Sequence, residues 1–152
     1  MQTRRQHLQQ SAVVAGMLAS TGLFPQFAHA AFNKAAFDAK SIADALKAYG
    51  AGAPTESKDV TITAPDIAEN GAVVPLGAST SLPNVKQLLI LVEKNPSSLV
   101  AMFNVTDSID AAVSTRAKMG QSSDVYAVAL TNDGKALFAK KEVKVTLGGC
   151  GG

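Results

Sequence analysis

Residues 88–92 read Leu-Leu-Ile-Leu-Val, a continuous apolar run in a chain of 152 residues. A run of this length without polar alternation is typical of a central strand that is covered on both faces. On its carboxyl side, Leu99, Ala101 and Phe103 occur at every second position and predict a second strand with these three residues on one face. The sequence therefore predicts a sheet built around this run.

Further strands are predicted on both sides of it. Val60, Ile62 and Ala64 alternate with threonines, and the extended segment 72–79 contains Pro75, which suits a sheet edge or a bulge. The remaining predicted strands are Ala111 to Lys118, Val125 to Thr131, Ala136 to Ala139 after the Asn132-Asp133-Gly134 hairpin turn, and a last strand in which Val143, Val145 and Leu147 face inward. Seven or eight short strands separated by turns predict a mainly β fold, an immunoglobulin-like antiparallel β-sandwich.

One amphipathic helix is expected before the strands. Asn33 can cap a helix that runs through about Tyr49, and Gly50 follows as a stop signal. Within this span Phe37, Ile42 and Leu46 lie along roughly one face. The helix and the sandwich together are expected to form a single domain at residues 31–147.

The amino-terminal segment has the features of an export signal. Arg4 and Arg5 precede a moderately apolar stretch, and Ala28-His29-Ala30 is a small-x-small cleavage site. The apolar stretch is shorter than the roughly 20 residues that span a bilayer, so a membrane anchor is disfavoured. We expect residues 1–30 to be a twin-arginine signal peptide with cleavage after Ala30, which places the mature protein in the periplasm.

Removal of this signal changes the composition. Arg4 and Arg5 leave with it, so 12 of the 14 basic residues remain against 12 acidic ones, and the mature chain is formally neutral. Nucleic-acid binding therefore loses its electrostatic support. Both histidines also leave, and the chain has one cysteine and no tryptophan. A Ser-His-Asp or Cys-His nucleophile and a histidine-ligated metal site are excluded by residue type, and we expect no metal or cofactor in this chain.

The single cysteine stands in Leu147-Gly148-Gly149-Cys150-Gly151-Gly152. Glycines offer no side chain for packing and lose the most backbone entropy on ordering, so this cysteine is not a core residue. We expect Gly148, Gly149, Gly151 and Gly152 to form a mobile carrier arm, residues 148–152, that presents Cys150 to another molecule. Its unperturbed pKa near 8.5 leaves a small thiolate fraction at neutral pH.

Other charged groups have simpler explanations. Carboxylate pairs that could act together or bind a cation stand beside turn residues, where carboxylates usually cap the backbone; they are Asp66/Glu69 and Asp107/Asp110. Lysines before the arm could attract an anionic substrate or an acidic partner, but solvated or edge-protecting roles are favoured; they are Lys135, Lys140, Lys141 and Lys144.

The tail and the segments around it resemble a known family. The Gly148-Gly149-Cys150-Gly151-Gly152 sequence, preceded by residues 141–147, resembles the SoxY sulfur-carrier family of the bacterial thiosulfate-oxidising (Sox) multienzyme system. The segments Ile67 to Pro75, Leu82 to Val85 and Leu91 to Pro96 also look like strand segments of that family, and the twin-arginine signal fits it. The resemblance covers essentially the whole chain.

The resemblance implies that Cys150 is a covalent attachment point and that the chain is a carrier, not an enzyme. A haem c enzyme would join thiosulfate to it as a cysteine S-thiosulfonate, a manganese-dependent hydrolase would release sulfate, and a molybdenum/haem sulfane dehydrogenase would oxidise the remainder. It also implies a heterodimer with a SoxZ-like β-sandwich subunit that is exported together with this chain. No membrane or nucleic-acid partner is implied.

Two other functions stay open at this level. An exported β-sandwich interaction module could use Cys150 for an intermolecular disulfide. A thiol enzyme of peroxidatic type is disfavoured, because the mature chain has no histidine and its one arginine, Arg116, is distant in sequence.

Overall fold

The apolar run lies in strand β5 (Val85–Val92), which pairs antiparallel with β6 (Leu99–Asn104) on one side and β8 (Ser123–Thr131) on the other. Successive side chains of a strand point to opposite faces of the sheet. Leu88 and Ile90 pack in one hydrophobic cluster, Leu89 and Leu91 pack in another, and all four are fully buried. The prediction of a strand covered on both faces is confirmed.

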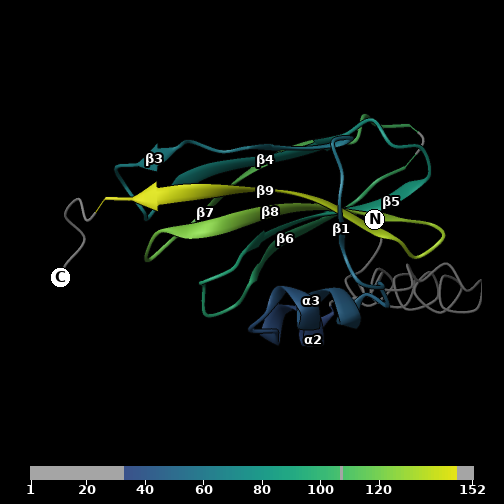
Figure 1. The fold of residues 1–152 in the computed structure, drawn as a ribbon, viewed down its shortest axis with the longest axis horizontal. Helices are drawn as coiled ribbons and strands as arrows, with labels where there is room; N and C mark the ends of the chain where they lie inside the picture. The colour runs from purple at the N-terminus through teal and green to yellow at the C-terminus, as the bar shows by residue number, and fades with distance from the viewer. Residues whose placement is uncertain (1–32, 107, 147–152) are drawn as a thin grey trace, which may run out of the picture. The chain divides into compact units, whose positions relative to one another are not determined.

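The computed structural model describes residues 33–106 and 108–146, which belong to a compact unit that begins at Asn33. Two sheets make up most of this unit (Figure 1). The large sheet has the order β1-β9-β8-β5-β6, with β1 (Thr55–Glu56), β9 (Ala136–Val145) and, also paired to β9, β3 (Ile67–Ala68). The small sheet has the order β2-β4-β7, with β2 (Val60–Thr63), β4 (Val74–Thr80) and β7 (Ala112–Ala117).

Two cores separate three layers. One core lies between the two sheets and includes Leu76 of β4, Ile90 of β5 and Val125 of β8. The other lies between the large sheet and the helices and includes Leu46 and Val128. The helices therefore cover the face of the large sheet that points away from the small sheet (Figure 1). The mainly β sandwich predicted from the sequence is confirmed.

The single helix predicted over residues 33–49 is wrong, because the structure has two short helices, α2 (Lys34–Asp38) and α3 (Ile42–Ala48). Ala39 between them is extended, and the Ser41 hydroxyl caps α3 by accepting from the Asp44 N–H at 3.1 Å. A serine cap satisfies an orphan N–H and so favours a new helix start at this point. The predicted stop at Gly50 is confirmed by its φ of 69°.

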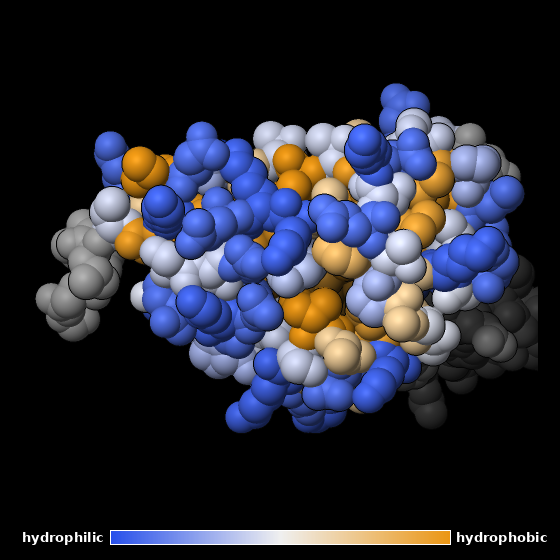
Figure 2. Space-filling model, viewed as in Figure 1, coloured by the Kyte–Doolittle hydropathy of each residue, from blue (hydrophilic) through white to orange (hydrophobic). Residues whose placement is uncertain are grey.

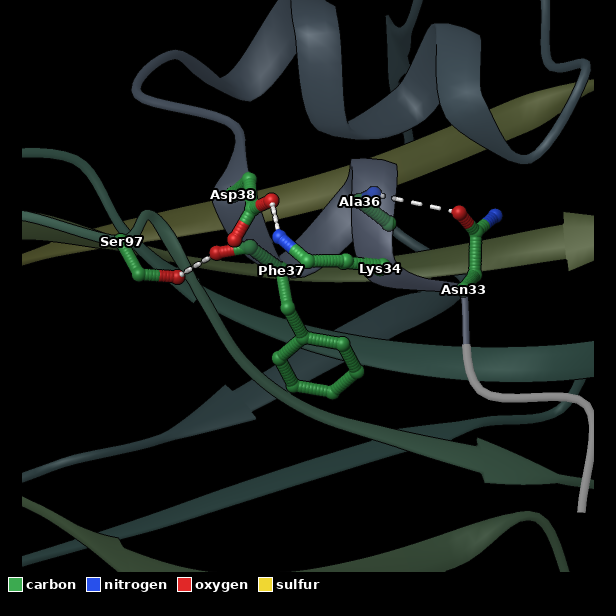
Figure 3. Close-up of polar contacts among 6 residues, drawn as sticks. All are labelled: Asn33, Lys34, Ala36, Phe37, Asp38 and Ser97. Atoms are coloured by element: carbon green, nitrogen blue, oxygen red, sulfur yellow. Dashed lines mark hydrogen bonds and ion pairs between the residues drawn. The ribbon is translucent and has the colours of Figure 1, made fainter.

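Helix α2 is fixed at both ends (Figure 3). The Asn33 side chain accepts from the Ala36 N–H at 3.2 Å, which confirms the predicted cap. At the other end the Ser97 hydroxyl donates to the Phe37 carbonyl, and the Ser98 N–H donates to the Ala39 carbonyl at 3.1 Å. The turn between β5 and β6 therefore holds the break between the helices in place.

Strand β6 also differs from its prediction. The register between β5 and β6 shifts between Ile90 and Leu91, so that Ile90 faces Ala101 and Leu91 faces Leu99. A bulge of this kind turns the following side chains to the other face. Leu99 consequently packs in the helix-side core, whereas Phe103 packs against the core between the sheets, and the prediction of a common face is wrong for these two residues.

Pro75 lies on β4, the middle strand of the small sheet, but the strand has only one neighbour at that position. Pro75 is aligned with Arg116 of β7, whereas the pairing with β2 begins at Gly77. The ring therefore removes no hydrogen bond that β2 would need. The predicted edge environment is confirmed locally, although β4 as a whole is central.

The strands predicted at residues 136–139 and from Val143 onward form one strand, β9, of ten residues. It pairs antiparallel with β8 from Ala136 to Val143 through the predicted hairpin. On its other edge β9 pairs in parallel with two short strands, of which β1 is not predicted from the sequence and β3 lies within the segment from Ile67 to Pro75 that resembles strand segments of the SoxY family. The sandwich is thus antiparallel except along this edge.

Candidate functional site at the end of β9

The residues predicted to carry the function lie outside the described part of the chain. These are Cys150 and Gly148, Gly149, Gly151 and Gly152 of the arm, together with Arg4, Arg5 and the cleavage site after Ala30. The described chain ends at Thr146, directly after β9. The structure therefore describes the base from which the predicted arm continues.

The end of β9 is held on both edges. On the β8 side, pairing stops at Val143, and the Val145 N–H donates instead to the Ser122 hydroxyl at 2.9 Å. On the β3 side, the Lys144 N–H donates to the Asp66 carbonyl at 3.0 Å and the Thr146 N–H donates to the Ala68 carbonyl at 3.1 Å. The N–H groups of residues 144–146 therefore all have hydrogen-bond acceptors, and the chain is held up to Thr146, the last described residue.

Residues 66–73, which we call the strap, include β3 and continue past it along the end of β9. The Gly71 carbonyl accepts from the Met119 N–H at 2.7 Å. A Cβ at Gly71 would lie 2.4 Å from the Met119 carbonyl oxygen and 2.8 Å from Cγ1 of Val145. Only a residue without a side chain fits between these two groups, so Gly71 fixes how closely the strap approaches β9.

The loop of residues 118–123 supports the other side of the same site. Asn95 donates through its side-chain amide to the Lys118 carbonyl at 2.8 Å, and the Lys94 N–H donates to the Ser123 hydroxyl at 3.0 Å. Met119 is buried, with 1% of its surface exposed. The loop that carries Ser122 is therefore tied to the turn between β5 and β6.

Three of the four lysines before the arm are in ion pairs. Lys135 lies 2.6 Å from Asp133, Lys140 lies 3.1 Å from Asp124, and Lys141 lies 2.9 Å from Asp66 and donates to the Ala64 carbonyl at 2.7 Å. The hydrogen bond to Asp133 raises the pKa of Lys135, and that to Asp124 raises the pKa of Lys140. These contacts favour the structural role that we expected for the lysines over an anion-binding role.

Of the two acidic pairs, one contributes to an ion pair and the other is only partly described. Asp66 forms its ion pair with Lys141 of β9, and Asp107 lies outside the described residues. Within residues 33–106 and 108–146 no group of three or more His, Cys, Asp or Glu side chains is placed to hold a metal ion. None of the helices in this part of the chain is long and apolar enough to cross a membrane.

A hollow of about 920 Å³ lies over the outer face of the small sheet, away from the core between the sheets. Its walls come from β4, β7 and the residues that follow β2, and Arg116 is its one charged lining residue. The hydroxyl groups of Ser79, Ser114 and Thr115 also line it, but the lining holds no carboxylate, histidine or lysine that could act as a general base.

The residues that hold the end of β9 are not predicted from the sequence. Ser122 and Gly71 occur in turns, and β3 has only two residues, too few for any periodicity to be seen. The Asn70-Gly71 dipeptide was the available signal, because this pair is typical of a tight turn. Asn70 does form one, with its side chain accepting from the Ala72 N–H at 2.9 Å.

One protein family matches most of the chain. Residues 45–150 match the family described as sulfur oxidation protein SoxY. Among solved structures, the sulfur carrier protein SoxY from Chlorobium limicola f thiosulfatophilum is 37% identical with a TM-score of 0.64. That match covers 70% of this chain and 97% of the other.

A superoxide reductase (neelaredoxin) from Ignicoccus hospitalis also has a similar fold, with 19% identity and a TM-score of 0.51 over 57% of this chain and 79% of that one. Identity at this level supports the shared sandwich fold alone. Among curated proteins, no sequence matches the chain.

Proposed function

The chain belongs to the SoxY family of sulfur oxidation proteins, and on that basis we propose that it carries thiosulfate-derived sulfur covalently on Cys150 and presents it to partner Sox enzymes. The observation that carries this proposal is the extent of the family match. The match runs from residue 45 to residue 150, so it includes Cys150 and the two glycines before it.

The proposed attachment is a two-electron oxidation. A bond forms between Sγ of Cys150 and the outer sulfur of thiosulfate, while the thiol proton and two electrons leave. A haem c enzyme takes the electrons, and the product is a cysteine S-thiosulfonate. Because the partner holds the redox centre, the carrier needs no cofactor of its own.

The proposed release is a hydrolysis. Water attacks the terminal sulfone in a manganese-dependent hydrolase and the bond to the outer sulfur breaks. Sulfate and two protons leave, and the outer sulfur keeps the electron pair and stays on Cys150. A sulfane dehydrogenase would then oxidise this remaining sulfur. In this scheme the chain is the substrate of each step and the catalyst of none.

The described base supports this role physically. The N–H groups of residues 144–146 are held by Ser122 and by the strap, so the chain leaves the sandwich from a fixed point. Extended at about 3.5 Å per residue, the four residues from Thr146 to Cys150 give the thiol a reach of about 14 Å. Glycines next to the cysteine add no bulk at the entrance of a narrow active site.

We further propose that the chain acts as a heterodimer with a SoxZ-like subunit in the periplasm. The twin-arginine signal at residues 1–30 supports this location, because that route carries folded cargo and a partner without a signal can travel with it.

Intact-mass analysis tests the attachment. The heterodimer is incubated with thiosulfate and the haem c enzyme, with the Cys150→Ser variant as the control. We expect the mass added by one thiosulfate, confined to the peptide that contains Cys150 and missing from the variant. Adducts on another residue, or a mass increase that corresponds only to a disulfide-linked second chain, would contradict the carrier role.

A further inference from the structure

The reach of the arm limits where an enzyme can bind. This argument rests on the proposed carrier function. An active site that receives Cys150 must approach within about 14 Å of Thr146, and any depth of the site shortens that separation further. A specific interface of standard size covers about 800 Å² on each partner, equivalent to a disc about 16 Å in radius. The surface around Thr146 therefore falls within an interface of standard size that is centred on the entry point of the arm.

The strap lies within that area. Its Ala68 carbonyl accepts from the Thr146 N–H at 3.1 Å, and Ile67 is aligned with Lys144 on β9. Neighbouring strands are about 4.8 Å apart, which places the backbone of Ile67 within about 10 Å of Thr146. Val73 follows two residues after Gly71, whose backbone approaches Val145. Ile67 is thus closer to Thr146 than the thiol can reach, and Val73 lies on the same strap two residues beyond its contact with Val145.

These two residues are also unusually exposed. The large hydrophobic residues that are exposed in the described part of the chain are Ile67 at 58%, Val73 at 52% and Ile109 at 55%. Two of the three lie on the strap, beside the end of β9. Figure 2 shows hydrophobic surface at this end of the domain among hydrophilic residues. The core of an interface is more apolar than its rim, and removing exposed apolar side chains from water favours binding.

We propose that Ile67 and Val73 are the docking contacts through which the carrier binds the enzymes that receive Cys150. The occupant is the apolar rim of an active-site entrance, which closes over the strap while the arm enters the site. One apolar contact serves several enzymes because it depends on no specific charge pattern. The electrically neutral mature chain is consistent with docking that does not rely on electrostatic steering.

Steady-state kinetics of the haem c enzyme test this, with the heterodimer as the varied substrate. The double variant Ile67→Thr with Val73→Thr keeps β-branching, and thus the strap backbone, while it replaces apolar surface by hydroxyl groups. We expect KM for the carrier to rise about tenfold or more with kcat unchanged, since docking is lost and the chemistry is not. The manganese-dependent hydrolase should show the same change with the thiosulfate-loaded carrier.

Ile109→Thr is the matched control. Ile109 and the strap lie next to opposite ends of β7. Ile109 precedes Ala112 at the start of this strand, whereas the strap leads into Val74, which pairs with Ala117 at its end. The KM of the haem c enzyme for the Ile109→Thr carrier should equal its KM for the wild-type carrier. Reaction of Cys150 with a small thiol reagent and heterodimer formation should be the same in all proteins.

The two proposals fail in different ways. An unchanged KM in the double variant, with normal loading of the wild type, would overturn the docking role alone. Loss of the heterodimer in the double variant, but not in Ile109→Thr, would also overturn it, by assigning the strap to the partner subunit. A wild-type carrier that takes up no thiosulfate would contradict the proposed function itself.

Discussion

At the scale of single residues, the close approach at Gly71 is the feature most sensitive to substitution. Replacing Gly71 by Ala places a methyl group 2.4 Å from the Met119 carbonyl oxygen, a backbone atom that moves only with its loop. We expect the free energy of unfolding to fall by about 1–3 kcal/mol, as for other overpacked sites, measured by thermal or urea unfolding. Amide exchange at Val145 and Thr146 should also accelerate.

Gly120→Ala is the control for this prediction. It lies in the adjoining loop, and a Cβ there meets no atom within 4 Å. Its stability should stay within about 0.5 kcal/mol of the wild type. Equal effects of the two substitutions would show that the strap does not pack against Met119 as described.

A second residue-scale prediction concerns the hairpin between β8 and β9. Hydrogen bonds from Lys135 and then from the Thr131 hydroxyl lower the pKa of Asp133 from its ordinary 3.8 to about 2. A lowered folded pKa adds stability above the unfolded pKa and loses it as the pH falls through the folded one. The contribution should disappear between about pH 4 and pH 2, and it is small because the pair is exposed.

An NMR titration of the Asp133 carboxyl group measures this directly. The midpoint should lie well below 3.8 and should move upward in Lys135→Ala. A wild-type midpoint at 3.8 would refute the hydrogen-bonded geometry at the turn.

At the scale of elements, the break between α2 and α3 depends on one cap. The Ser41 hydroxyl accepts from the Asp44 N–H at 3.1 Å and donates to the Asp44 carboxylate at 2.7 Å. Ser41→Ala should lower the free energy of unfolding by about 1 kcal/mol. Helix content by circular dichroism should fall or stay constant. A rise in both stability and helix content would mean that α2 and α3 had joined into the single helix predicted from the sequence.

The sequence predicts a strand correctly where its hydrophobic pattern gives the same result in any pairing register. Residues 88–92 are apolar on both faces of β5, so no choice of register changes the conclusion. The face of Leu99 depends on a bulge, and the bulge depends on how β6 meets β5. Because that is a tertiary contact, alternation along one strand does not reveal it.

The same limit applies to the candidate site. A lone cysteine between glycines and the family resemblance predict Cys150 as the attachment site, but the groups that hold the end of β9 come from distant segments. Ser122 and Asp66 reach consecutive N–H groups of β9 from separate loops. Polar residues at 140–142 favour a break between two predicted strands, whereas Lys140 and Lys141 lie within β9, aligned with Tyr126 and Val125 of β8. Such contacts become visible only in three dimensions.

At the scale of the whole molecule, the large sheet ends in an uncharged strand. Among the described residues β6 pairs only with β5, and its sequence, Leu-Val-Ala-Met-Phe-Asn, contains no lysine or proline to block pairing with another chain. We expect the chain expressed alone to form homo-oligomers, some of them linked through Cys150. Co-expression with a SoxZ-like subunit should convert them to a heterodimer, as measured by light scattering with and without reductant. A monomer at high concentration would contradict this expectation.

The hold on β9 has a mechanical consequence. If an enzyme binds Cys150 as proposed and dissociates while the thiol is still engaged, the component of its pull along the direction of β9 acts on the bonds at the end of this strand. The three bonds made by the N–H groups of residues 144–146 run across that direction, so tension loads them together in shear instead of opening them one after another. The load would then pass into the strap and the loop of residues 118–123, to which these bonds connect the end of β9.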